Sequence, residues 1–160
     1  MTEYQTEHRV WALNEHNCFG CGSLNGIGLH LEFYVTGEGD AVWAEWMPTT
    51  SYEGYGGMIH GGIICTLLDE VTAWSLYAKN TWAVTARMQT NFRKPVKVGE
   101  PVRLVGRVTR ERGRVLEIRG EVRLAADDTL LAEADATFIR VPESQAQAWN
   151  EQYLTTQEGD

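Results

Sequence analysis

Residues 61–79 read Gly-Gly-Ile-Ile-Cys-Thr-Leu-Leu-Asp-Glu-Val-Thr-Ala-Trp-Ser-Leu-Tyr-Ala-Lys, and this stretch decides the fold. Its length and the helical spacing of its apolar residues predict one helix of about five turns. Apolar side chains occur on almost every side of that helix, which is typical of a helix buried in a protein core. Asp69 and Glu70 are the only acids inside it, so the role of each has to be explained.

Strands are predicted on both sides of this helix, because apolar and polar residues alternate there with a period of two. The strands are expected at 29–35 and 42–46, which form a hairpin, and then at 82–92, 102–110, 114–124 and 130–141. In the strand 82–92, the even-numbered residues are expected on one face. A single sheet covers a helix that is apolar all round only by curling around it. The sequence therefore predicts an α+β fold, a curled antiparallel sheet around one long helix, with a second subunit completing the burial.

Length and composition predict one globular domain. The chain has 160 residues, of which 43% are hydrophobic and 22% charged, as in ordinary globular proteins. We expect a core at about 18–141, a lead-in at 1–17 with a short helix, and a polar tail at 142–160 with a helix around 145–153. The net charge of −8 argues against general nucleic-acid binding.

The N-terminal residues and the cysteines predict a cytoplasmic location. The first residues are polar and lack the apolar core of a signal peptide, and no apolar run approaches the ~20 residues that a membrane helix needs. Three cysteines, an odd number, argue against a disulfide framework. We therefore expect a reduced protein that does not bind a membrane.

The start of the long helix is the strongest candidate site. His60, Gly61 and Gly62 precede Asp69 by two turns. A helix N-terminus offers unpaired N–H groups and a positive dipole end, which suit an oxyanion, and a carboxylate among small residues suits a general base. The alternatives stay open: Asp69 forms a cap or an ion pair at a subunit interface, His60 is an ordinary loop histidine, and Glu70 is structural.

Three stretches resemble a known family. Residues 59–70, Ile-His-Gly-Gly-Ile-Ile-Cys-Thr-Leu-Leu-Asp-Glu, resemble the signature of hotdog-fold acyl-CoA thioesterases of the phenylacetate-pathway (PaaI-like) type. Residues 83–100, which include Phe-Arg-Lys-Pro-Val-Lys-Val-Gly-Glu, resemble the next element of that family. The glycine-rich start, Cys-Phe-Gly-Cys-Gly at 18–22 with Gly-Leu-His-Leu-Glu-Phe at 28–33, resembles the lead-in of one branch. The resemblance covers about 18–141.

The resemblance implies a hotdog fold and the hydrolysis of an acyl-CoA thioester by a homodimer or homotetramer, without a metal or redox cofactor. It implies that Asp69 acts as general base or nucleophile and that the Gly61 N–H polarises the thioester carbonyl. Gly62 is expected to contact the substrate, His60 to shape the site, and Thr85 to act in the partner subunit's site. Two alternatives remain: a non-catalytic acyl-CoA-binding protein, and a dehydratase acting on 3-hydroxyacyl thioesters.

One position departs from the family pattern. Some members carry a side-chain amide six residues before the histidine, where this chain has Gly54. Tyr52, Glu53 and Tyr55 are nearby candidates to replace that amide. Its absence keeps the binding-protein alternative open.

Arginines are concentrated in one predicted hairpin. Seven of the fourteen Lys and Arg residues lie between 103 and 123. A turn centred on Arg112 and Gly113 would place Arg107 opposite Glu117 and Arg103 opposite Glu121, as cross-strand ion pairs.

The same register would place Arg110 and Arg114 opposite each other, with Arg112 between them. Like charges in that arrangement are unfavourable unless an anion lies there. We therefore expect these three arginines to bind the phosphates of coenzyme A; the alternative is a solvated hairpin end.

Cys18 and Cys21 form a Cys-x-x-Cys pair shortly after His16. Structural zinc sites have four ligands, and the remaining candidates, Cys65 in the helix and His30 on a strand, are predicted elsewhere. The sequence thus favours a glycine-rich turn with two small buried thiols over a metal site.

Overall fold

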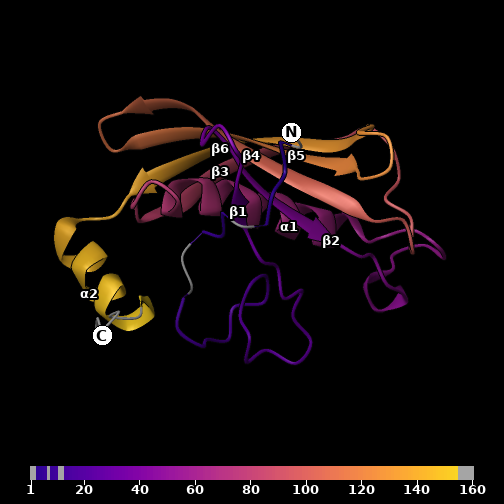
Figure 1. The fold of residues 1–160 in the computed structure, drawn as a ribbon, viewed down its shortest axis with the longest axis horizontal. Coiled ribbons are helices and arrows are strands. Elements are labelled where there is room, and N and C mark those ends of the chain that lie inside the picture. The colour runs from indigo at the N-terminus through magenta and orange to yellow at the C-terminus, as the bar shows by residue number, and fades with distance from the viewer. Residues whose placement is uncertain (1–2, 7, 11–12, 155–160) are drawn as a thin grey trace.

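The computed structural model describes residues 3–6, 8–10 and 13–154, and it consists of one antiparallel sheet with a long helix against one face (Figure 1). The helices are α1 (Gly61–Tyr77) and α2 (Glu143–Tyr153), with a 3-10 turn at Thr50–Tyr52. The strands are β1 (Tyr34–Val35), β2 (Val42–Trp46), β3 (Ala83–Phe92), β4 (Val102–Arg112), β5 (Val115–Leu124) and β6 (Leu130–Arg140). Their order in the sheet is β1-β2-β4-β5-β6-β3. The predicted α+β architecture is confirmed, and so is the buried helix.

Two glycines set the distance between α1 and the sheet. Gly106 on β4 and Gly120 on β5 are paired across the two strands. A Cβ on Gly106 would lie only 2.5 Å from the Val71 carbonyl oxygen, and one on Gly120 would lie 2.8 Å from the Thr72 side chain. Because no side chains stand in between, the helix backbone packs almost directly on the sheet.

The opposite side of α1 is covered by the N-terminal part of the same chain. Phe33 stacks on Trp74, with ring centroids 5.0 Å apart, and Leu29 and Leu31 belong to the same buried cluster. The expected strand at 29–35 therefore shrinks to β1, because 29–33 packs on the helix and His30 has a positive φ of 52°. The chain itself supplies much of the cover that was expected from a second subunit.

Strand β3 lies at the edge of the sheet and contains a bulge. Its pairing with β6 shifts between Thr85 and Arg87, which exchanges the two faces of the strand. Thr85 and Met88 consequently both face α1, while Val84 is 48% exposed. The prediction that the even-numbered residues of 82–92 share one face is wrong for this reason.

The β4–β5 register also differs from the prediction. Arg112 pairs with Val115, so the turn is formed by Gly113 and Arg114, one residue later than expected. As a result Arg103 lies opposite Arg123 and Arg107 opposite Arg119. The two predicted cross-strand ion pairs are wrong. Arg103 instead forms an ion pair with Glu45 on β2, and Arg107 forms one with Glu3.

The structure contains the helix predicted near the C-terminal end but, in the described residues, no helix near the N-terminal end. The helix expected around 145–153 is present as α2, and its Trp149 packs on Trp82. The described part of the lead-in forms no helix; it makes isolated bridges, Arg9 with Tyr34 and Leu13 with Leu154. No helix in the described part of the chain is both long and apolar enough to cross a membrane.

The close approach of α1 to the sheet predicts that Gly106→Ala destabilises the protein. The added methyl group meets backbone on Val71, which cannot rotate away, so we expect a loss of about 1–3 kcal/mol in the free energy of unfolding. Urea denaturation measures this loss. Gly26→Ala is the matched control, because a Cβ there has nothing within 4 Å. Equal stability of the two variants would contradict the packing described above.

Candidate active site

The N-terminus of α1 presents one available N–H donor. His60 is the N-cap residue, and its Nδ1 accepts a hydrogen bond of 2.9 Å from the Gly62 N–H. Among the described residues, the Gly61 N–H donates no hydrogen bond. Gly61 therefore offers a polarising donor at the positive end of the helix dipole. The N–H of Gly62, which was expected to contact the substrate, is already occupied, and the His60 ring is a cap.

Asp69 is held in place by the edge strand. Thr85 on β3 donates a hydrogen bond of 2.8 Å from its Oγ1 to Asp69 Oδ1, which leaves Oδ2 available. Cys65 and Thr66, one turn earlier on α1, are small and half-buried. The resemblance assigned Thr85 to the partner's site, whereas in the structure Thr85 contacts Asp69 of its own chain.

Gly61 and Asp69 of one chain are too far apart to act on one carbonyl. Eight residues of helix separate them, which corresponds to a rise of about 12 Å. The two residues instead lie near opposite ends of β3. Gly61 faces Phe92, since a Cβ on Gly61 would be 3.7 Å from the Phe92 ring, and Asp69 contacts Thr85.

The capping histidine lies close to Gly54 in the loop before α1. A Cβ on Gly54 would lie 3.2 Å from His60 Cα, so a side chain there would require His60 to move by a few tenths of an ångström. Of the three candidate replacements, Tyr52 donates its hydroxyl to the Gly28 carbonyl and Glu53 accepts the Gly57 N–H. Tyr55 is 82% exposed.

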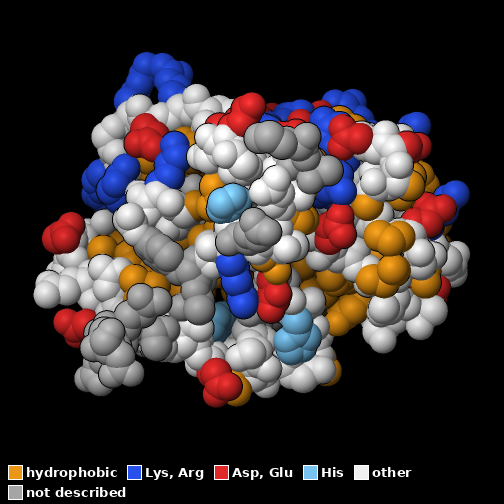
Figure 2. Space-filling model, viewed as in Figure 1, with side chains coloured by type: hydrophobic (Ala, Val, Ile, Leu, Met, Phe, Trp, Pro, Cys, Tyr) orange, Lys and Arg blue, Asp and Glu red, His pale blue; other side chains and the backbone are white. Residues whose placement is uncertain are grey.

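The arginines of the β4–β5 hairpin end do not form the predicted like-charge pair. Arg110 lies opposite Glu117, and Arg114 belongs to the turn and donates to the Arg140 carbonyl. Arg110, Arg112 and Arg114 are all exposed, and basic side chains project from this end of the sheet in Figure 2. The argument for phosphate binding from two facing arginines is therefore wrong. The phosphate-binding role itself stays a prediction.

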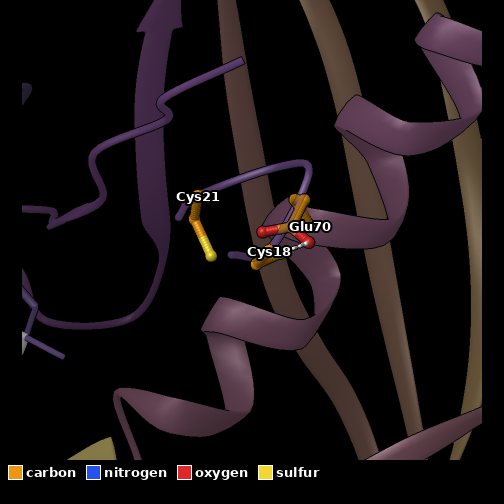
Figure 3. Close-up of side chains that lie close together, drawn as sticks. All are labelled: Cys18, Cys21 and Glu70. Atoms are coloured by element: carbon orange, nitrogen blue, oxygen red, sulfur yellow. Dashed lines mark hydrogen bonds between the residues drawn. The ribbon is translucent and has the colours of Figure 1, made fainter. Parts of the chain in front are cut away.

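The structure adds Glu70 to the Cys-x-x-Cys pair that was identified in the sequence. Glu70, the residue after Asp69, faces the loop that carries Cys18 and Cys21 (Figure 3), and Cys18 Sγ is hydrogen-bonded to Glu70 Oε1 at 3.5 Å. Gly20 makes this possible, because a Cβ there would be 2.3 Å from the Glu70 side chain. The sequence showed two cysteines with a glycine between them, but it did not reveal that Glu70 is their partner.

These three groups change one another's acidity. Burial raises the pKa of Glu70 to about 8. The hydrogen bond from Cys21 lowers the pKa of Cys18 to about 5, while the bond to Cys18 and burial raise the pKa of Cys21. Of the two thiols, Cys18 is therefore the more acidic.

The cluster opens into a pocket with a volume of about 630 Å³. Residues of the N-terminal loop, α1 and α2 surround it, together with Trp82 just before β3. Its lining residues include His16, Cys18, Cys21, Glu70, Tyr77 and Trp82. Trp82 and Tyr77 pack with ring centroids 5.0 Å apart, so one wall of the pocket is aromatic.

Comparison with known proteins agrees with this architecture. The family model described as "Thioesterase superfamily" matches residues 56–132, which include the whole of α1. A solved structure of a thioesterase superfamily protein, 24% identical, superimposes with a TM-score of 0.72 over 77% of this chain and 63% of that one. The protein has the hotdog fold. The fold that the resemblance implied is thereby confirmed.

More specific relationships are distant. The acyl-coenzyme A thioesterase THEM4 of Xenopus laevis is 28% identical over 118 residues, which cover 73% of this chain and 53% of that protein. This chain thus spans about half the length of that relative. The Escherichia coli PaaI protein from the phenylacetic acid degradation operon has a TM-score of 0.65 at 15% identity, covering 71% of this chain and 81% of that one. That likeness shows the fold, and the narrower PaaI-like type stays a prediction.

The raised pKa of Glu70 predicts a specific pH dependence of stability. The folded chain holds this proton up to about pH 8, whereas the unfolded chain releases it near the ordinary value of 4.5. The folded state therefore binds more protons in this window, and the stability from Glu70 falls as the pH rises through it. Cys18 has the opposite effect, because its lowered pKa makes the folded chain release a proton that the unfolded chain keeps. In Glu70→Gln only the Glu70 contribution disappears, so the stability of the variant relative to the wild type should increase as the pH rises from 5 to 8. Urea unfolding of both proteins with a chelator present measures this difference, and a difference independent of pH would contradict the raised pKa of Glu70.

Proposed function

We propose that the protein hydrolyses an acyl-CoA thioester to a carboxylic acid and coenzyme A. The hotdog fold of the thioesterase superfamily and the distant relationship to an acyl-coenzyme A thioesterase support this reaction class. The observation that carries the proposal is the Asp69 carboxylate, held by Thr85 through one oxygen while the other remains available. A positioned carboxylate of this kind contributes ~10²–10⁴ in rate as a general base.

The active site in this proposal is shared by two copies of the chain. Strand β3 ends the sheet, and its outer edge is unpaired in the described chain. It also exposes apolar side chains, with Val84 48% and Phe92 56% exposed. A long edge strand with such residues is suited to pairing with another strand. A second copy would pair its own β3 antiparallel to the first, across a twofold axis.

This pairing brings the two halves of the site together. When the axis passes near the middle of β3, Thr85 of one copy lies opposite the partner's Phe92. Phe92 is beside Gly61 and Thr85 holds Asp69, so the Gly61 N–H of one copy approaches the Asp69 carboxylate of the other. The separation of about 12 Å within one helix is then bridged by the dimer.

The chemistry follows from these positions. The thioester carbonyl oxygen accepts the Gly61 N–H, which stabilises negative charge on that oxygen in the transition state. Asp69 Oδ2 removes a proton from water as the water attacks the carbonyl carbon, or attacks that carbon itself and forms an anhydride that water then hydrolyses. In both routes the C–S bond breaks and the sulfur leaves as the thiol of coenzyme A. The bond from Thr85 keeps the carboxylate oriented.

Two substitutions test the catalytic groups separately. Asp69→Ala should lower kcat/KM by ~10²–10⁴. Gly61→Pro should lower it by ~10²–10³, because proline removes the N–H donor but is well tolerated at the first position of a helix. Gly61→Ala is the matched control, since it keeps the N–H and its Cβ makes an ordinary contact with Phe92. Release of coenzyme A from a panel of short, long and aromatic acyl thioesters measures the rate.

The panel also decides between the alternatives. Full activity of Asp69→Ala, or equal losses in Gly61→Ala and Gly61→Pro, would contradict the assigned roles. Binding of acyl-CoA without turnover of any thioester would instead indicate the non-catalytic binding protein.

Mixing the two inactive variants tests the shared site. If Gly61 and Asp69 act from different copies, a dimer of one Asp69→Ala chain and one Gly61→Pro chain contains one intact site. Activity should then return after the variants are unfolded and refolded together. Each variant refolded alone is the control. Absence of activity in mixed dimers, isolated by two affinity tags, would show that the shared site is wrong.

A further inference from the structure

The cluster of Cys18, Cys21 and Glu70 has the composition of a metal site. The two sulfur atoms and a carboxylate oxygen all lie within 4.8 Å of one another. They come from a loop and from α1, two segments far apart in the sequence (Figure 3). Thiolate and carboxylate are both ligands of Zn²⁺. The helix therefore supplies a third candidate ligand, Glu70, which the sequence analysis did not identify.

The distance between Cys18 and Glu70 agrees with tetrahedral coordination. Zinc binds sulfur at about 2.3 Å and a carboxylate oxygen at about 2.0 Å, which places the two ligand atoms of a tetrahedral site about 3.5 Å apart. Cys18 Sγ lies 3.5 Å from Glu70 Oε1. The loop is also fixed by backbone bonds, since the Gly22 N–H donates to the Cys18 carbonyl and the Leu31 N–H donates to the Gly20 carbonyl. The Cys18 and Glu70 ligand atoms thus have the separation that a tetrahedral zinc site requires, and Cys21 Sγ lies within 4.8 Å of both.

The charges around the cluster favour a cation as well. Glu70 lies in the interior, and the groups that act on it are the two thiols and Asp69, all of which are acidic. The ion pairs formed by the described residues include none with Glu70. Three acidic groups thus meet in one half-buried place, and His16 is the only basic side chain among the described residues that line the adjoining pocket. Buried charges in proteins are either paired or bound to a metal ion.

We propose that Cys18, Cys21 and Glu70 bind one Zn²⁺ ion through two sulfur atoms and one carboxylate oxygen. The fourth position faces the pocket of about 630 Å³ and holds water. His16 lines the same pocket, but its Nδ1 accepts the Cys18 N–H, so that nitrogen orients the loop. The ion replaces the protons that otherwise lie among the three groups and fastens the loop to α1.

Metal content and spectroscopy test the site directly. Protein purified under reducing conditions, stripped with a chelator and reloaded should bind one Zn²⁺ per chain. Co²⁺ in its place should give a thiolate-to-metal charge-transfer band. X-ray absorption of the zinc-loaded wild type should show two sulfur ligands at about 2.3 Å together with oxygen or nitrogen. Bound zinc should also protect Cys18 and Cys21 from alkylation.

Variants distinguish this site from other places on the chain. Cys18→Ser, Cys21→Ser and Glu70→Gln should each weaken Zn²⁺ binding by about tenfold or more, since even second-shell changes cost that much. Cys65→Ser is the matched control, because Cys65 is the third free cysteine and lies outside the cluster. Its affinity for Zn²⁺ should equal that of the wild type.

Several outcomes would overturn the site. The first is absence of stoichiometric Zn²⁺ in the reduced wild type. The second is Zn²⁺ binding by Cys18→Ser and Cys21→Ser with the same affinity as the wild type. The third is a Cys18–Cys21 disulfide that persists under reducing conditions. If the cysteine variants fail to fold, the absorption spectrum of the wild type decides, and fewer than two sulfur ligands refutes the proposal. None of these measurements depends on thioesterase activity, so the two proposals fail independently.

Discussion

The contact between α1 and the sheet at Gly106 and Gly120 is the constraint on which the rest of the structure depends. The helix backbone lies so close to β4 and β5 that a single methyl group would collide with Val71. Packed interiors of this density do not deform continuously. The helix therefore has one rotation and one depth, and each side chain on it faces a definite neighbour.

That fixed rotation gives two adjacent acids two different environments. Consecutive residues of a helix point about 100° apart. Asp69 turns toward the edge strand and accepts a hydrogen bond from Thr85, whereas Glu70 turns toward the glycine-rich loop and meets Cys18. The first carboxylate lies beside the strand at the edge of the sheet. The second lies among thiols, and partial burial there raises its pKa.

Much of the fold was predictable because periodicity is a local property. The helix expected at 61–79 is observed at Gly61–Tyr77, and the strands after it occur close to their expected positions. Register was not predictable, because it depends on a bulge at one residue in β3 and on a turn displaced by one residue in the β4–β5 hairpin. A bulge of one residue turns the later side chains of β3 to the other face, and a turn displaced by one residue moves each cross-strand partner by two, which places Arg107 opposite Arg119 and not opposite Glu117.

The sequence by itself determined the long apolar helix, the strands around it, Gly61 as a candidate N–H donor and Asp69 as a candidate base, because spacing and residue type are properties of the chain alone. Only the tertiary structure decided what those residues touch. It placed Thr85 on Asp69, occupied the Gly62 N–H with His60, and brought Cys18 and Cys21 to Glu70 across about fifty residues of chain. Such contacts depend on how the helix is rotated against the sheet, and no local pattern encodes that rotation.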